Sequence, residues 1–112
     1  MSIRAVKHVN KDENNRIEFL LVDWDYIDGS DYIAKLFSEE YGFAVGKKFD
    51  GIWYSIIRIH LGICEYELLW HEDIGNEIYC LNQTEEENDL LQHRLERILD
   101  ILNARIEKAA KQ

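Results

Sequence analysis

The chain has 112 residues, a length that supports one hydrophobic core but would leave two separate cores marginal, so we expect a single domain over residues 1–112. Apolar residues make up 46% of the sequence, which argues against an intrinsically disordered protein. The formal net charge of −9 disfavours binding to nucleic acid or anionic membranes and favours basic partners.

The N-terminal segment predicts a cytoplasmic protein whose fold begins with a β-hairpin. Residues 1–10 lack the apolar stretch of a signal peptide, and no later apolar run approaches the roughly 20 residues that span a bilayer. The β-favouring runs 3–9 and 16–22 are separated by the polar cluster 10–15, which is typical of a turn between two strands.

The next stretch, Asp23–Tyr32 (DWDYIDGSDY), combines four carboxylates with three large aromatic side chains and has no positive charge. An EF-hand calcium loop that started at Asp23 would need glycine and glutamate where Asp28 and Ala34 stand, so we expect no such site. Two interpretations remain. The stretch is a loop that leads into a capped helix, or it is a recognition surface in which aromatic residues form the hot spot and carboxylates pair with Lys or Arg.

If the alternation of strand 16–22 continued, Trp24 would lie opposite the core face, so we expect a partly exposed indole. The candidate partner-binding residues of this stretch are Asp23, Trp24, Asp25, Tyr26, Asp28 and Asp31.

A helix is expected after this stretch, with Ser30 or Asp28 as its N-cap and Gly42 just beyond its C-terminus. Three strands follow, at about residues 52–61, 64–71 and 77–81, with turns near Gly62 and 72–76. In the first of them, alternation predicts one face toward the core, made of Trp53, Ser55, Ile57, Ile59 and Leu61.

No group of residues predicts catalysis or metal binding. Cys64 and Cys80 are too few for a disulfide framework and are expected to be buried thiols, and with His60 and His71 they match no zinc-site spacing. Nearly every acid alternates outward or lies in a turn, whereas paired catalytic carboxylates need an apolar cleft. We therefore expect a protein that is not an enzyme and has no cofactor.

The final helix has the clearest local signature. Thr84 to Glu87 forms a capping box, and apolar residues recur at three- and four-residue steps from Leu91 to Ala109. The expected helix, about residues 85–109, is longer than a small sheet needs, so its end is expected to overhang the fold or to support self-association. The order ββαβββα predicts an α+β fold with one mainly antiparallel sheet packed against this long helix.

The negative charge is concentrated before this helix. Nine acids and no Lys or Arg occur between Glu65 and His93, whereas residues 94–112 carry five basic residues and three acids. A run of one sign attracts an oppositely charged partner and accelerates association. The candidate partner-binding residues of this run are Glu65, Glu67, Glu72 and Asp73.

With its size, its acidic run Glu65–Asp89 and its acidic and aromatic stretch Asp23–Tyr32, the chain resembles the immunity proteins of bacterial toxin systems, such as those of contact-dependent growth inhibition and nuclease colicins. The resemblance implies an inhibitor that binds a basic toxin domain, frequently a nuclease, and blocks its active site or substrate path. The alternative is a homo-oligomeric or regulatory scaffold without catalytic activity, assembled through the C-terminal helix.

Overall fold

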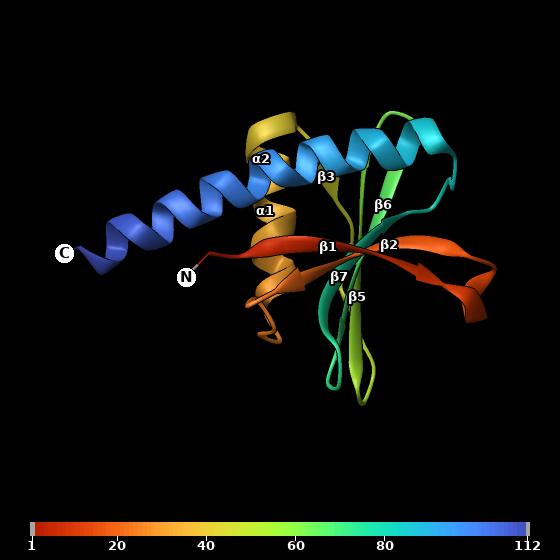
Figure 1. The fold of residues 1–112 in the computed structure, drawn as a ribbon, viewed down its shortest axis with the longest axis horizontal. Coiled ribbons are helices and arrows are strands. Elements are labelled where there is room, and N and C mark those ends of the chain that lie inside the picture. The colour runs from red at the N-terminus through yellow and green to blue at the C-terminus, as the bar shows by residue number, and fades with distance from the viewer. Residues whose placement is uncertain (1, 112) are drawn as a thin grey trace.

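The computed structural model describes residues 2–111 and contains one antiparallel sheet of seven strands with two helices on one of its faces (Figure 1). The strands lie in the order β1-β2-β7-β6-β5-β3, and β4 also pairs with β5. The predicted α+β class is confirmed, and two strands of two residues each, β3 and β4, are added to the predicted order. The elements are β1 (Arg4–Asn10), β2 (Arg16–Val22), α1 (Gly29–Tyr41), β3 (Ala44–Val45), β4 (Phe49–Asp50), β5 (Tyr54–Leu61), β6 (Cys64–His71), β7 (Gly75–Cys80) and α2 (Glu85–Ala110).

The N-terminal hairpin is formed as predicted, and it joins the rest of the sheet through β2. Its connection is a single 3₁₀ turn, Lys11–Glu13, followed by Asn14 and Asn15, which both have positive φ. Asparagine tolerates this left-handed conformation better than most residues. β2 then pairs with β7, with Phe19 opposite Ile78, so β1 forms one edge of the sheet.

The core lies between the sheet and the two helices. One row of buried apolar side chains crosses four strands at Phe19, Ile78, Leu68 and Ile57. The predicted core face of β5 is confirmed for Ser55, Ile57 and Ile59. It is wrong for Trp53 and Leu61, which are 59% and 37% exposed, because Trp53 precedes the first residue of β5 and Leu61 adjoins the turn at its other end.

Helix α1 ends at the predicted glycine. Gly42 has φ +79°, and its N–H donates to the carbonyl of Ser38 at 2.9 Å, as in a left-handed C-terminal cap. Asp28 occupies the N-cap position, but its side chain makes no capping hydrogen bond. The buried face of α1 carries Phe37, whose ring contacts those of Phe43 and Tyr66 edge-on.

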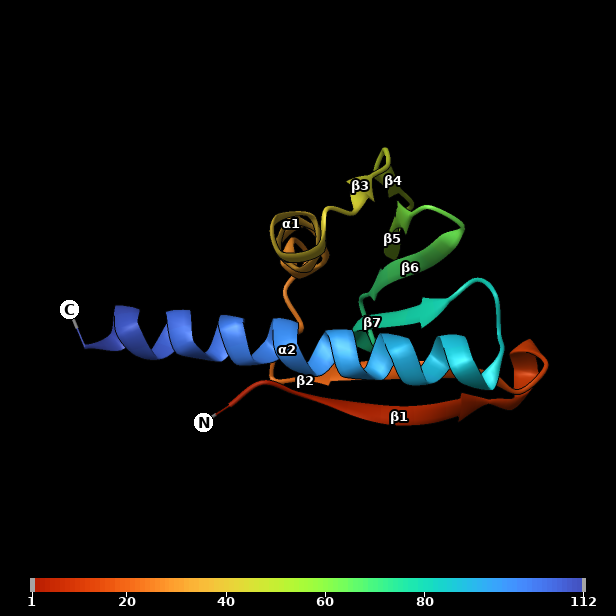
Figure 2. The same ribbon diagram turned by 90° about the horizontal axis from the view of Figure 1, so that it is seen from above.

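Helix α2 crosses α1 and extends beyond the rest of the molecule (Figure 2). Its apolar stripe packs on the core as far as Leu102, and no later residue up to Lys111 is buried. The predicted overhang of its C-terminal end is confirmed. Neither α2 nor any other helix in residues 2–111 is long and apolar enough to cross a membrane.

Candidate protein-binding surface

Three loops meet at one end of the sheet, the lower end of β5 to β7 in Figure 1. They are residues 23–28 between β2 and α1, residues 51–53 between β4 and β5, and residues 72–74 between β6 and β7. Loops 23–28 and 72–74 contain most of the candidate partner-binding residues. These two loops are more than 40 positions apart in the sequence. The fold therefore brings the two acidic segments together.

Asn76 holds loop 23–28 in place. Its side chain is buried, and Nδ2 donates to the carbonyl oxygens of Trp24 at 2.8 Å and Tyr26 at 2.9 Å. Oδ1 accepts from the hydroxyl of Ser30 at 2.6 Å. Gly29 is needed beside this contact, because a Cβ at Gly29 would lie 2.5 Å from Nδ2 of Asn76. The loop is thus fixed to β7 by hydrogen bonds to its own backbone.

Trp24 is half-buried, but not for the reason given by strand alternation. β2 ends at Val22, and Asp23 adopts φ +67°, so the alternation does not continue into the loop. The indole packs against the core and against the rings of Tyr26 and Tyr32, and its N–H donates to the carbonyl of Gly29 at 3.1 Å. Trp24 therefore stabilises the conformation of loop 23–28 from the side of the core.

A second tryptophan joins this loop to β6. The indole N–H of Trp70 donates to the carbonyl oxygen of Asp25 at 3.0 Å. Beside it lies an open groove of about 460 Å³, lined by side chains that include Ile27, Trp53 and Glu72. The groove connects loop 23–28 with loop 51–53.

Apolar side chains are unusually exposed around this groove. Ile52 is 85% exposed, and Trp53 is 59% exposed. Tyr26, Ile27 and Ile74 are also more than half exposed. Large apolar residues that gather at one place on a surface, rather than being scattered singly, are typical of protein-binding sites.

Unpaired carboxylates surround these apolar side chains. Asp23, Asp25, Asp28, Glu72 and Asp73 are exposed, and none of them forms an ion pair within residues 2–111. We call the combined region the acidic–aromatic surface, and it consists of Asp23, Asp25, Tyr26, Ile27, Asp28, Ile52, Trp53, Glu72, Asp73 and Ile74.

Asp31 lies near this surface but is already neutralised. Its carboxylate accepts a hydrogen bond from Nζ of Lys48 at 2.8 Å, and the same ammonium lies 3.9 Å from Asp50. Among the predicted partner-binding acids of loop 23–28 and α1, Asp31 is therefore the least available to pair with a basic side chain of a partner.

The structure does not bring Glu65 and Glu67 to the acidic–aromatic surface. Glu65 is half-buried toward the other end of β6, opposite His60 of β5. Glu67 is only 6% exposed, and its carboxylate accepts from Nε of Arg58 at 3.0 Å. The acidic run from Glu65 to Asp89 is thus divided among different parts of the molecule.

The expectation that the strand acids alternate outward into solvent is wrong for three of them. Glu18, Glu67 and Glu77 lie on the sheet face opposite the helices, yet each is less than 7% exposed. Neighbouring side chains cover them. Arg16 covers Glu18, because its Nη2 lies 2.6 Å from that carboxylate while its guanidinium stacks 3.8 Å above the ring of Tyr79.

Glu77 has no arginine of its own. Its pKa is raised to about 7, chiefly by burial and also by the negative charge of Glu18 and a hydrogen bond to that carboxylate, against the opposing charge of Arg16. Three buried carboxylates thus share two guanidinium groups, those of Arg16 and Arg58. Sequence reasoning missed this cluster because it depends on how β2, β6 and β7 pair.

The thiols and the possible metal ligands offer no site for chemistry among residues 2–111. Cys64 and Cys80 are free thiols, and Cys80 is buried, which raises its pKa to about 12. Among residues 2–111 no three His, Cys, Asp or Glu side chains are arranged to hold a metal ion. Comparisons of the chain with protein-family models, with curated proteins and with solved structures found no match.

Proposed function

We propose that this protein is an acidic inhibitor that binds a basic protein, and specifically an immunity protein that neutralises a basic nuclease toxin domain. The observation that carries the proposal is the acidic–aromatic surface, where five unpaired carboxylates surround exposed Tyr26, Trp53 and three isoleucines. The sequence resemblance to immunity proteins supports the choice of a toxin as partner. The proposal includes the predicted cytoplasmic location and no catalytic activity of its own.

The two kinds of side chain on this surface suit different steps of binding. The apolar side chains provide area that a partner buries, and tryptophan and tyrosine are the residues most often found at binding hot spots. The carboxylates attract Lys and Arg, which accelerates the encounter and selects against acidic partners. A nuclease domain presents such basic residues where it contacts the phosphates of its substrate.

The test uses the purified protein and a basic nuclease toxin domain that is captured with it from the native host. We expect stoichiometric protein to abolish cleavage of DNA or RNA by that domain, with an association rate that falls as salt is added. Neutralising Asp25, Glu72 and Asp73 with Asn or Gln is expected to slow association and to weaken its salt dependence. A matched control variant, Asp12→Asn with Glu86→Gln and Asp89→Asn, neutralises three exposed acids that form no ion pair in residues 2–111 and lie away from this surface, and it is expected to change neither property.

Full nuclease activity in the presence of excess protein would contradict the proposal. So would an association rate that does not change with salt, because the carboxylates would then play no part in the encounter.

A homo-oligomeric scaffold is the second candidate, and the overhang of α2 is the observation that favours it. Beyond Leu102 the helix carries Ile106, which is 40% exposed, and this part of α2 extends past the sheet and α1 (Figure 2). Sedimentation equilibrium distinguishes the candidates, because a scaffold assembled through α2 becomes monomeric when Ile106 is changed to Glu. The immunity protein keeps its mass and its inhibition in the same variant.

A further inference from the structure

The edge strand β1 has a free outer side, and a contact with α2 identifies which residues face it. The side chain of Asn103 accepts from the N–H of Ile3 at 2.7 Å and donates to its carbonyl at 2.9 Å. The backbone groups of Ile3 therefore point away from β2. Since successive residues of a strand direct N–H and C=O to alternate sides, Ala5, Lys7 and Val9 also point outward.

A second contact, on the other side of β2, gives the same result. Gln83 accepts from the N–H of Ile17 at 2.9 Å and donates to its carbonyl at 3.3 Å, so the backbone groups of Ile17 point away from β1. Ile17 lies opposite Val9, and this pair consequently exchanges no hydrogen bonds. No side chain in residues 2–111 bonds to the backbone of Ala5, Lys7 or Val9.

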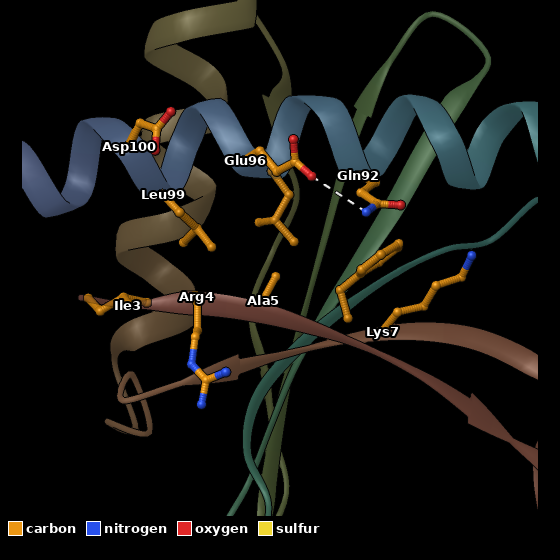
Figure 3. A pocket seen from close by; sticks show the side chains of 10 residues that line it. Ile3, Arg4, Ala5, Lys7, Gln92, Glu96, Leu99 and Asp100 are labelled. Carbon is orange, nitrogen blue, oxygen red and sulfur yellow. Dashed lines mark hydrogen bonds between the residues drawn. The ribbon is translucent and has the colours of Figure 1, made fainter. Parts of the chain in front are cut away.

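A groove of about 220 Å³ runs along this strand, between β1 and α2 (Figure 3). Its lining includes the apolar side chains of Ala5, Phe19, Leu95 and Leu99. Ala5 and Lys7 point toward α2, whereas Arg4 points away from it. An unpaired strand edge therefore lies beside a partly apolar groove, which is the arrangement that accepts an added strand.

The charges along the groove are unequal at its two ends. Asp100 of α2 lies toward the end where Asn103 holds Ile3, and Lys7 lies toward the other end, near Gln92 (Figure 3). Glu96 lies between them, and its carboxylate accepts a hydrogen bond from Nε2 of Gln92 at 3.4 Å. Neither carboxylate forms an ion pair with another residue of the described chain, and Lys7 does not form one either. A cationic side chain is thus favoured at the Asp100 end.

We infer that the groove between β1 and α2 binds an extended polypeptide segment of a partner protein, which adds to the sheet as a strand beside β1. The segment places apolar side chains over Ala5 and Leu99 and a basic side chain beside Glu96 and Asp100. Backbone hydrogen bonds to Ala5, Lys7 and Val9 supply affinity, and the groove selects the side chains. This site lies apart from the acidic–aromatic surface and does not rest on the proposed function.

A second copy of this chain is a poorer occupant. Pairing two β1 edges would bring the Arg4 and Lys7 side chains of both copies into one ribbon, and like charges on neighbouring strands are destabilising. A lysine on an edge strand also protects against such self-pairing. Two chains that each carry a net charge of −9 repel one another as well.

The probe is the synthetic peptide Thr-Glu-Thr-Val-Thr-Val-Thr-Arg-Thr, capped at both ends. In an antiparallel arrangement its glutamate lies near Lys7, its valines lie in the groove and its arginine lies near Asp100. We expect millimolar peptide to shift the amide NMR signals of Ala5, Lys7 and Val9 in the full-length protein. N-methylation of the two valines removes N–H groups that face β1 and is expected to abolish the shifts, whereas N-methylation of the threonine between them leaves the shifts in place.

A pair of protein variants tests the same contact from the other side. Lys7→Pro removes the charge of Lys7 and one outward N–H, a loss that an edge strand tolerates, and is expected to weaken peptide binding more than about tenfold. Lys7→Thr removes the same charge but keeps the N–H, so it is expected to bind the peptide. The peptide comparison decides the question should Lys7→Pro fail to fold.

Absence of shifts at millimolar peptide, or equal binding of the two methylated peptides, would overturn the inference. Dimerisation of the protein that Lys7→Pro abolishes would also overturn it, because the edge would then belong to a second copy.

Discussion

Glu77 is buried, and its ionised form is therefore unfavourable in the folded protein. The free energy of unfolding consequently depends on pH. Its pKa is raised from 4.5 to about 7, chiefly by burial, so the folded protein retains a proton that the unfolded chain releases. The contribution of Glu77 to the free energy of unfolding is fully present below about pH 4.5 and is lost as the pH rises through about 7.

We therefore predict that Glu77→Gln stabilises the protein at about pH 8 by about 1–3 kcal/mol, because one pKa unit corresponds to about 1.4 kcal/mol. Glutamine keeps the shape of the protonated acid and removes the charge near Glu18. Urea unfolding at about pH 5 and pH 8 measures the effect, which is expected to be smaller at the lower pH. Glu67→Gln is the matched control and is expected to destabilise, since it leaves Arg58 without its partner. A Glu77→Gln variant less stable than the wild type at the higher pH would show that Glu77 is ionised and well compensated.

Trp24 is expected to contribute more to stability than to direct contact with a partner. Trp24→Ala removes the packing against Tyr26 and Tyr32 and the hydrogen bond to Gly29, which for a half-buried indole is expected to cost about 2 kcal/mol or more. Chemical denaturation measures this loss, and any weaker binding is expected to follow from the altered shape of loop 23–28. A variant of wild-type stability with impaired binding would instead place Trp24 in the interface itself.

Local sequence predicts some residues of the candidate site and misses others. The acids and aromatic residues of loop 23–28 and the acids of turn 72–74 were predicted as binding residues from local sequence, because they occur close together in the chain. Trp53 was assigned to the core, because alternation does not reveal where a strand begins. The burial of Glu18, Glu67 and Glu77 depends on neighbours from other strands and on Arg16 folding over Tyr79, which one sequence does not specify.

Among the elements, α2 has the most sharply defined start. The hydroxyl of Thr84 accepts from the N–H of Glu87 at 3.1 Å, which confirms the predicted N-cap. The second half of the capping box is not formed. The carboxylate of Glu87 accepts from the thiol of Cys64 at 3.4 Å, while the N–H of Thr84 donates to the carbonyl of Asn82.

Thr84→Ala is accordingly predicted to lower the free energy of unfolding by about 0.5–2 kcal/mol, through loss of the single side-chain cap. Thermal or urea denaturation tests it, and Thr84→Ser, which keeps the hydroxyl, is expected to retain most of the wild-type stability. Equal stability of Thr84→Ala and wild type would mean that the cap contributes nothing to α2.

The elements were largely predictable because each has a local pattern. The spacing of leucines and isoleucines defines α2, and alternation bounded by turn residues defines β1, β2, β5 and β6 to within about two residues. The pairing of β2 with β7 was not predicted, since it joins segments about 60 residues apart and leaves no local signal. The short strands β3 and β4 are held by pairing with β5 rather than by their own sequence.

For the whole molecule, the consequence of this topology is that most of the candidate partner-binding residues gather at one end of the sheet. The opposite end of β5 and β6 presents a fully exposed Ile63 at the turn, but it lacks the ring of unpaired carboxylates found beside Trp53. Five unpaired carboxylates thus lie beside exposed apolar area at one place. We propose that the partner binds at that place.

Calorimetric titrations that compare Trp53→Ala with Ile63→Ala, against the nuclease domain proposed as partner, test this most directly. Both residues are exposed, so both variants are expected to fold as the wild type does. The account predicts that Trp53→Ala weakens binding by more than about tenfold, or 1.4 kcal/mol, whereas Ile63→Ala leaves the dissociation constant unchanged. Equal binding by Trp53→Ala and wild type, or a loss confined to Ile63→Ala, would contradict it and move the interface away from the acidic–aromatic surface.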